Sequence, residues 1–206
     1  MKQAKCILLA AAFAALVLPA AAQTTTNSSS ANSNTPPQTI QQRKENQQDR
    51  IGNGVQSGQL TAGETGHLEK QESDINHEEK DMRKLDDGHL TSADKATLNQ
   101  QQNHVSNEIY KDKHNDRTQN TDPKSEVGQR QRNQQDRIAQ GIKSGQLKPG
   151  ETAHLENHEA RVNREVHRDR AANGGKLTAG ERARVNRQQN RDSRRIYRDK
   201  HNGRRA

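Results

Sequence analysis

Two groups of side chains in this sequence have the type and spacing to bind a metal ion. His154 and His158 lie four residues apart, so both imidazoles would project from one face of a helix. A second group of carboxylates closes a recurring Gly-x-Leu-x-x-x-Glu/Asp segment. Its members are Glu64, Asp94, Glu151 and Glu181. Imidazole nitrogens suit zinc and carboxylate oxygens suit calcium, so the sequence offers a candidate site for Zn²⁺ and another for Ca²⁺.

The same recurring segment also has the pattern of a helix boundary. Gly58 can adopt the left-handed conformation that ends a helix. Thr61 can then accept a hydrogen bond as the N-cap of the next helix, with Glu64 three residues later as its capping-box partner. Thr91 and Thr178 have the same position in their segments. We expect these threonines to be helix caps, because capping gives every shared residue of the segment a local role.

The segment also resembles the second half of an EF-hand calcium loop. With Gly58 at the sixth loop position, Leu60 takes the apolar eighth position and Glu64 the twelfth, where that family has its bidentate ligand. The resemblance implies a calcium-binding role for Glu64. The first half of the loop departs from the family pattern. Its expected oxygen ligands are replaced by Asn53, Val55 and Ser57, and in the next segment by Arg83, Leu85 and Asp87.

The sequence contains none of the common catalytic signatures, and we predict that the protein is not an enzyme. It has no nucleophile elbow, phosphate loop or dinucleotide fingerprint. Carboxylates are frequent, yet we expect none of them to have the apolar surroundings that raise a pKa. Only 26% of the residues are hydrophobic and Trp is absent. Such a composition does not favour a water-excluding catalytic pocket.

Charge is distributed unevenly along the chain. Residues 43–116 carry a net charge of −5, whereas residues 130–206 carry +11, out of +8 for the whole sequence. The basic half contains an arginine-rich stretch that we predict to bind an anionic partner. Its candidate residues are Arg184, Arg187, Arg191, Arg194, Arg195 and Arg198. An anionic envelope surface, a polyanion, an acidic protein and the acidic half of the chain itself are the alternatives. Nucleic acid is disfavoured, because only two tyrosines could stack on bases.

An internal repeat must position all of these residues. Residues 43–115 align without a gap with residues 130–202, at an offset of 87, and about half of the aligned positions are identical. The sequence therefore predicts an acidic unit at 43–116, a linker at 117–129 and a basic unit at 130–206. A polar Ser/Asn/Thr-rich stretch at 23–42 ends in Pro-Pro and is typical of a disordered tether.

Apolar residues in each unit recur at helical spacing. Leu68, Ile75 and Met82 are seven apart, and no stretch alternates with a period of two. We predict an all-α fold with about three helices in each unit. The apolar seam is thin, so we expect helical hairpins with few contacts. The seam of the first unit would be formed by Ile51, Val55, Leu60, Leu68, Ile75, Met82, Leu85, Leu90, Leu98, Val105, Ile109 and Tyr110.

The first 22 residues have the pattern of a signal peptide. Lys2 and Lys5 precede a short apolar run, and Ala20 and Ala22 fit the cleavage positions. We therefore expect a secreted or periplasmic protein with no transmembrane segment after cleavage. The mature chain would lack cysteine, because Cys6 lies in the signal.

Three functions are compatible with these features. The first is a non-enzymatic interaction protein that binds partners through charged helical faces. The second is a chaperone-like envelope stress protein, because the Leu-Thr-x-x-Glu segments are similar to the Leu-Thr-x-x-Gln motifs of Spy/CpxP-type periplasmic chaperones. The third is a calcium or zinc binder of EF-hand descent. The repeat also resembles one found in uncharacterised exported bacterial proteins, which implies export and no particular activity.

Overall fold

The computed structural model describes residues 38–119 and 124–203. The predicted signal peptide and most of the predicted tether lie outside these residues. The described chain forms six helices and no strand, which confirms the all-α prediction for this part of the protein. The helices are α1 (Ile40–Ser57), α2 (Ala62–Leu85), α3 (Ser92–Lys113), α4 (Glu126–Lys143), α5 (Pro149–Ala172) and α6 (Ala179–Lys200). None of these six helices is long and apolar enough to cross a membrane.

The 87-residue offset relates α5 to α2 and α6 to α3 residue for residue, and α4 begins and ends one residue earlier than the offset from α1 gives. Two boundaries differ from the predicted ones, because α1 begins inside the expected tether and α4 begins inside the expected linker. In both cases an N-cap explains the earlier start. The Thr39 hydroxyl accepts a hydrogen bond from the Gln42 amide at 3.2 Å, and the Ser125 hydroxyl accepts one from the Gly128 amide at 3.1 Å.

The recurring segments begin helices in the way that a capping box does. Thr61, Thr91 and Thr178 are the N-cap residues of α2, α3 and α6. At α2 the Thr61 amide donates to the Glu64 carboxylate at 2.9 Å, and the Glu64 amide donates to the Thr61 hydroxyl at 3.3 Å. Gly58 ends α1 with a φ of 74°, in the left-handed region. The start of α5 keeps half of the box, because Lys148 has no side-chain acceptor.

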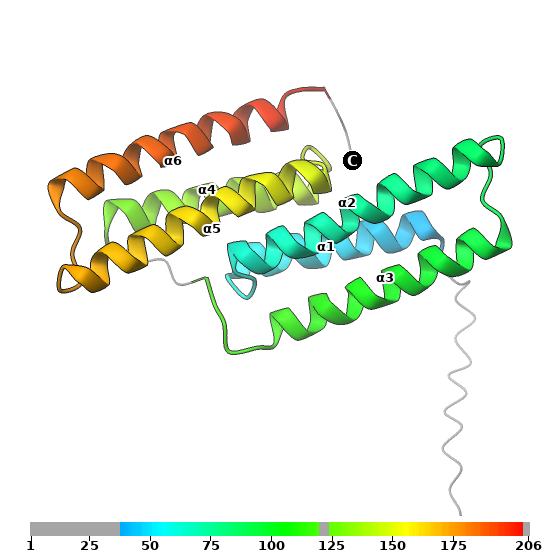
Figure 1. The fold of residues 1–206 in the computed structure, drawn as a ribbon, viewed down its shortest axis with the longest axis horizontal. Helices are drawn as coiled ribbons and strands as arrows, with labels where there is room; N and C mark the ends of the chain where they lie inside the picture. Colours follow the sequence, from blue (N-terminus) through cyan, green and yellow to red (C-terminus); the bar gives the residue numbers. More distant parts are fainter. Residues whose placement is uncertain (1–37, 120–123, 204–206) are drawn as a thin grey trace, which may run out of the picture. The chain divides into compact units, whose positions relative to one another are not determined.

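Equivalent helices of the two repeats pack against each other. The most extensive contact in the described chain joins α2 to α5, and α1 packs against α4. Among the six helices, α3 contacts only α1 and α2, and α6 contacts only α4 and α5, so these two helices flank the central four (Figure 1). This arrangement differs from the sparse hairpins predicted from the sequence, because each thin apolar seam gains its second face from the other repeat.

One apolar cluster therefore extends through both repeats. Its most buried members come from all six described helices and from the turns after α1 and α4. They are Ile51, Leu60, Leu68, Leu98, Ile109, Ile138, Leu147, Leu155 and Ile196. A smaller cluster of Val127, Val162, Val166 and Val185 lies within the second repeat. Burial of a large aliphatic side chain stabilises a fold by about 1.5–3 kcal/mol, so the shared cluster supplies much of the stability of both repeats.

Two residues of the predicted seam are exposed instead of buried. Leu85 is 84% exposed and Tyr110 is 60% exposed. Successive helical residues are rotated by about 100°, so Tyr110 cannot share the inward face with Ile109. By the same rotation Leu85, the last residue of α2, lies about 100° away from Leu68 around the helix. The spacing of these two residues therefore places both of them toward solvent.

Buried glutamines bind main-chain carbonyls on neighbouring helices and so tie the helices together. The Gln47 side-chain amide donates to the main-chain carbonyl of Gln102 at 2.8 Å. The Gln102 side-chain amide donates to the main-chain carbonyl of Ile40 at 3.0 Å. The second repeat contains the same pair of bonds, made by Gln134 and Gln189. A hydrogen bond contributes about 0.5–1.5 kcal/mol net, so these bonds supplement the limited apolar core.

Candidate functional surfaces

The inward face of α6 fixes which of its arginines reach solvent. Val185, Gln189, Asp192 and Ile196 are the buried residues of this helix and recur every three or four positions. Each is followed two residues later by an arginine, at Arg187, Arg191, Arg194 and Arg198. Two residues correspond to a rotation of about 200°, so the four arginines line the face opposite the core. All four are exposed. We call this set the arginine stripe.

No side chain of the arginine stripe forms a hydrogen bond or an ion pair with another residue of the described chain. Two arginines that the sequence groups with them behave differently. Arg184 binds Asp169 at 2.8 Å and also contacts Glu165. Arg195 donates to the His158 ring at 2.6 Å and lies 3.7 Å from Asp192. The structure therefore assigns four of the six predicted anion-binding arginines to an outer surface and two to contacts between helices.

The equivalent face of α3 lacks this charge. The offset of 87 places Gln100, His104, Asn107 and Lys111 at the stripe positions, and all four are exposed. His104 lies 3.2 Å from the Glu108 carboxylate. Two helices with the same position in their repeats thus present different outer faces, so α3 provides a built-in comparison for α6.

The carboxylates that could bind calcium accept hydrogen bonds at the starts of helices instead. The buried Glu64 carboxylate receives the Thr61 amide and hydroxyl through one oxygen and the Asn115 side chain at 2.9 Å through the other. Glu151 binds the Lys148 amide at 3.1 Å and the Asn202 side chain at 2.8 Å. Asp94 and Glu181 bind the amides of their cap threonines. Each of the four carboxylates serves the start of a different helix, so the fold does not gather them.

Two arginines and one carboxylate lie beside the histidine pair, since Asp192 is 3.9 Å from the His158 ring. The rings of His154 and His158 lie edge to face, with centroids 4.8 Å apart. Arg161 and Arg195 both contact the His158 ring. Burial and the neighbouring guanidinium groups lower the pKa of His158 to about 4. A metal cation at this position would meet the same positive charge. Across residues 38–119 and 124–203, no group of three or more His, Cys, Asp or Glu side chains has a metal-binding arrangement.

Sequence reasoning missed four buried carboxyl groups. Glu69 and Glu72 on α2 and Glu156 and Glu159 on α5 are at most 1% exposed. The expectation that no carboxylate has apolar surroundings is therefore wrong. Burial raises the pKa of Glu72 to about 7 and that of Glu156 to about 8. The detectable signal was the identity of both glutamates in the two repeats, one and four residues after the seam residues Leu68 and Leu155.

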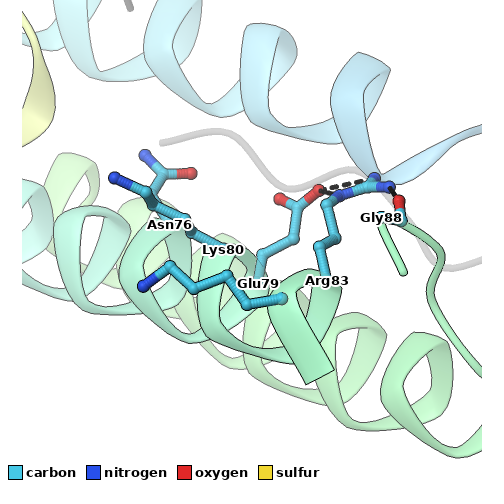
Figure 2. A pocket seen from close by; sticks show the side chains of 6 residues that line it. Asn76, Glu79, Lys80, Arg83 and Gly88 are labelled. Atoms are coloured by element: carbon cyan, nitrogen blue, oxygen red, sulfur yellow. Dashed lines mark hydrogen bonds and ion pairs between the residues drawn. The ribbon is translucent and has the colours of Figure 1, made fainter. Parts of the chain in front are cut away.

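Two cavities of the described chain have linings of mixed charge. One of about 710 Å³ opens beside α1, α2 and the α4–α5 turn, and its lining includes Lys44, Asp49, Glu72 and Lys143. A shallow depression at the end of α2 is shown in Figure 2. There Arg83 joins the Glu79 carboxylate at 2.8 Å to the Gly88 carbonyl at 3.1 Å, so its polar groups bind one another. Neither lining selects a ligand of one charge.

The comparisons with known proteins give no relative. No family model matches the chain, and neither a curated protein nor a solved structure is significantly similar to it. The function must therefore be argued from the surfaces described above.

Proposed function

We propose that this protein is a non-enzymatic binder of extended anionic partners and that the arginine stripe of α6 is its contact surface. The observation that carries the proposal is the position of Arg187, Arg191, Arg194 and Arg198 directly opposite the buried face. All four guanidinium groups are exposed and form no ion pair within the described chain. Helix packing does not require these four arginines, because α3 packs on its own repeat in the same way and has a nearly neutral outer face.

The geometry favours a partner with regularly repeated phosphate or sulfate groups. The stripe runs for about 16 Å along the helix at 1.5 Å per residue, with one guanidinium on each turn. A guanidinium presents several donors in a planar fork that suits oxyanions. The surface is an outer helix face without an enclosing pocket, so it suits a polymer or a lipid surface better than a small anion. Export of the protein, as predicted from its N-terminus, would place such partners outside the cytoplasm.

The test is a salt titration of the whole mature chain against a sulfated polysaccharide such as heparin. The test variant carries the α3 residues on α6, as Arg187→Gln, Arg191→His, Arg194→Asn and Arg198→Lys. We expect its affinity to fall at least tenfold at about 0.05 M salt and the remaining binding to be less salt-dependent. The attraction between exposed charges is screened beyond about 10 Å at 0.1 M salt. The wild-type affinity should therefore also fall steeply as salt is added.

A control variant removes three positive charges elsewhere in the basic repeat, as Arg132→Gln, Arg164→Gln and Lys176→Gln. These residues are exposed and lie outside the stripe. We expect the control to lose less than about threefold in affinity, since only screened long-range attraction is reduced. An equal loss in both variants would contradict the proposal, because it would mean that net charge and not the stripe determines binding. The variants belong in the whole chain because the repeats share a core.

A further inference from the structure

The two helices that join the repeats carry four buried carboxyl groups where apolar residues would be expected. Glu69 and Glu72 of α2 and Glu156 and Glu159 of α5 are 0%, 1%, 0% and 1% exposed. We call them the carboxyl cluster. Glu69 and Glu156 face each other across the contact between α2 and α5, whereas Glu72 faces Lys44 of α1 and Glu159 faces Asp192 of α6. A change in the charge of Glu69 or Glu156 therefore acts directly on the contact that joins the repeats.

Few hydrogen-bond donors reach the carboxyl cluster. The Gln48 amide donates to Glu69 at 3.1 Å, and the equivalent Gln135 amide donates to Glu156 at 3.0 Å. The second oxygen of each of these two carboxyls has no partner. One oxygen of Glu72 and both oxygens of Glu159 also have none. A buried ionised carboxylate is costly unless its oxygens are bonded or a cation is near.

The carboxyl cluster lacks hydrogen-bond donors and not acceptors. Every buried side-chain atom without a partner in the described chain is an oxygen, and the oxygens of Gln48 and Gln135 are among them. An ionised carboxyl only accepts hydrogen bonds, whereas a protonated one donates one O–H. Proton uptake would therefore remove a buried charge and also add a donor beside orphan acceptors. The geometry of the cluster favours its neutral form.

The neighbouring charges do not offset this preference. From α1, Lys44 faces Glu72, but the Lys44 ammonium is already bound to Glu79. Across the interface Glu69 faces Glu156, and from α6 Asp192 faces Glu159. The cations close to Asp192 are Arg161, Arg191 and Arg195, and none of them is a close partner of Glu159. Burial and repulsion between carboxylates together raise the pKa of both Glu69 and Glu159 well above its usual value.

We propose that the carboxyl cluster makes the pairing of the two repeats proton-dependent: neutral carboxyls hold α2 against α5, and their ionisation loosens this contact. The sign follows from linkage. A carboxyl with a raised pKa in the folded state stabilises the fold below its unfolded pKa, near 4.5, relative to higher pH. That stability is lost as the pH rises through the folded pKa, which is about 7 for Glu72 and about 8 for Glu156.

The experiment is a set of thermal melts of the whole mature chain between pH 5.5 and 8.5 at constant ionic strength. We expect the melting temperature to be lower at pH 8.5 than at pH 5.5 by at least about 5 °C, since 1 kcal/mol shifts the midpoint of a chain of this size by about 2–4 °C. The double variant Glu69→Gln and Glu156→Gln mimics the neutral form in both repeats. It should lose at least half of this pH-dependent drop and melt higher than wild type at pH 8.5.

A control double variant, Glu45→Gln and Glu126→Gln, changes two exposed glutamates and should retain the full drop. A wild-type melting temperature that is constant or rises toward pH 8.5 would overturn the proposal. So would an undiminished drop in the Glu69→Gln/Glu156→Gln variant, because another group would then be responsible. If that variant fails to fold, the single variants Glu69→Gln and Glu156→Gln replace it, and each should reduce the pH-dependent drop. The outcome of the melts is independent of heparin binding, so this proposal and the proposed function can fail separately.

Discussion

At the scale of single residues, the two repeats depend on close approaches that only small residues allow. Leu60 folds back over Gly54, and Leu147 folds over Gly141 in the same way. A Cβ atom on Gly54 would lie 2.6 Å from the Leu60 Cδ1 atom, and one on Gly141 would lie 2.6 Å from the Leu147 Cδ1 atom. Both leucines are fully buried. These glycines therefore allow the turn after the helix to close over the core.

Gly54→Ala should consequently destabilise the protein although alanine favours helix formation. We expect a loss of about 1–3 kcal/mol in the free energy of unfolding, as for other overpacked cores, measured by urea denaturation. Gly180→Ala is the matched control, because Gly180 is also helical and has no atom within 4 Å of its Cβ position. It should be stabilising by up to about 1 kcal/mol. Stabilisation by both substitutions would show that the Gly54–Leu60 contact is not tight in solution.

The carboxyl cluster shows where residue-level sequence reasoning fails. The helix spacing of Leu68 and Ile75 is visible in the sequence, and so is the repetition of Glu69 and Glu72 at Glu156 and Glu159. Nothing within one repeat indicates that this polar edge of the seam is buried. At Glu69 the second repeat covers this edge, because α5 packs against α2 and brings Glu156 close to Glu69. Analysis of apolar spacing assumes that each helix has one buried face. In the structure α2 packs against helices of its own repeat and also against α5 of the other repeat.

At the scale of elements, the recurring segments all begin helices, but they differ in how completely they form the capping box. Three of them have a complete Thr-x-x-Glu/Asp box, and α5 begins with Lys148 and Pro149. The six helices and the cap positions could be predicted because they depend on local chemistry. The predicted units begin at residues 43 and 130, whereas α1 and α4 begin at Ile40 and Glu126, because the alignment of the repeats starts after the caps Thr39 and Ser125.

An exchange between two of these segments tests the capping interpretation. Lys148→Thr should complete the box of α5 and raise the free energy of unfolding by about 0.5–1 kcal/mol, whereas Thr61→Lys should lower it by about 1 kcal/mol or more. Urea denaturation followed by circular dichroism measures both. The opposite signs control for the chemistry of the exchange itself. Two effects of the same sign, or none, would mean that the threonine hydroxyl does not determine the stability of these helix starts.

At the scale of the whole molecule, the fold is set by the contact between repeats. The sequence showed the duplication and the charge difference, but it could not show that the apolar seams of α1, α2, α4 and α5 meet. The reason is that each seam is short of apolar residues in isolation. The polar composition favours two loose hairpins until the shared cluster, with Ile51 and Ile138 fully buried, is taken into account.

Separately produced halves should show this dependence directly. We expect chains 38–119 and 124–203 to be less helical alone than in the intact protein and to regain helicity when mixed in equal amounts, because each half supplies the missing apolar face of the other. Circular dichroism and analytical ultracentrifugation measure the two properties. The acidic and basic halves should also combine more readily at low salt. Fully helical, monomeric halves that do not combine would contradict the importance of the shared core.

The pairing of α1 with α4 and of α2 with α5 matches each helix to its own counterpart. Contacts of this kind are isologous, as in homodimers with two-fold symmetry. The molecule is in effect a dimer held within one chain. Covalent linkage allows the two copies to differ in sequence. Both keep the same pair of buried glutamates on the helices that meet, whereas their outer helices carry different charge. An oligomer of identical subunits would have to display a given outer face twice, and this chain displays its arginine face once.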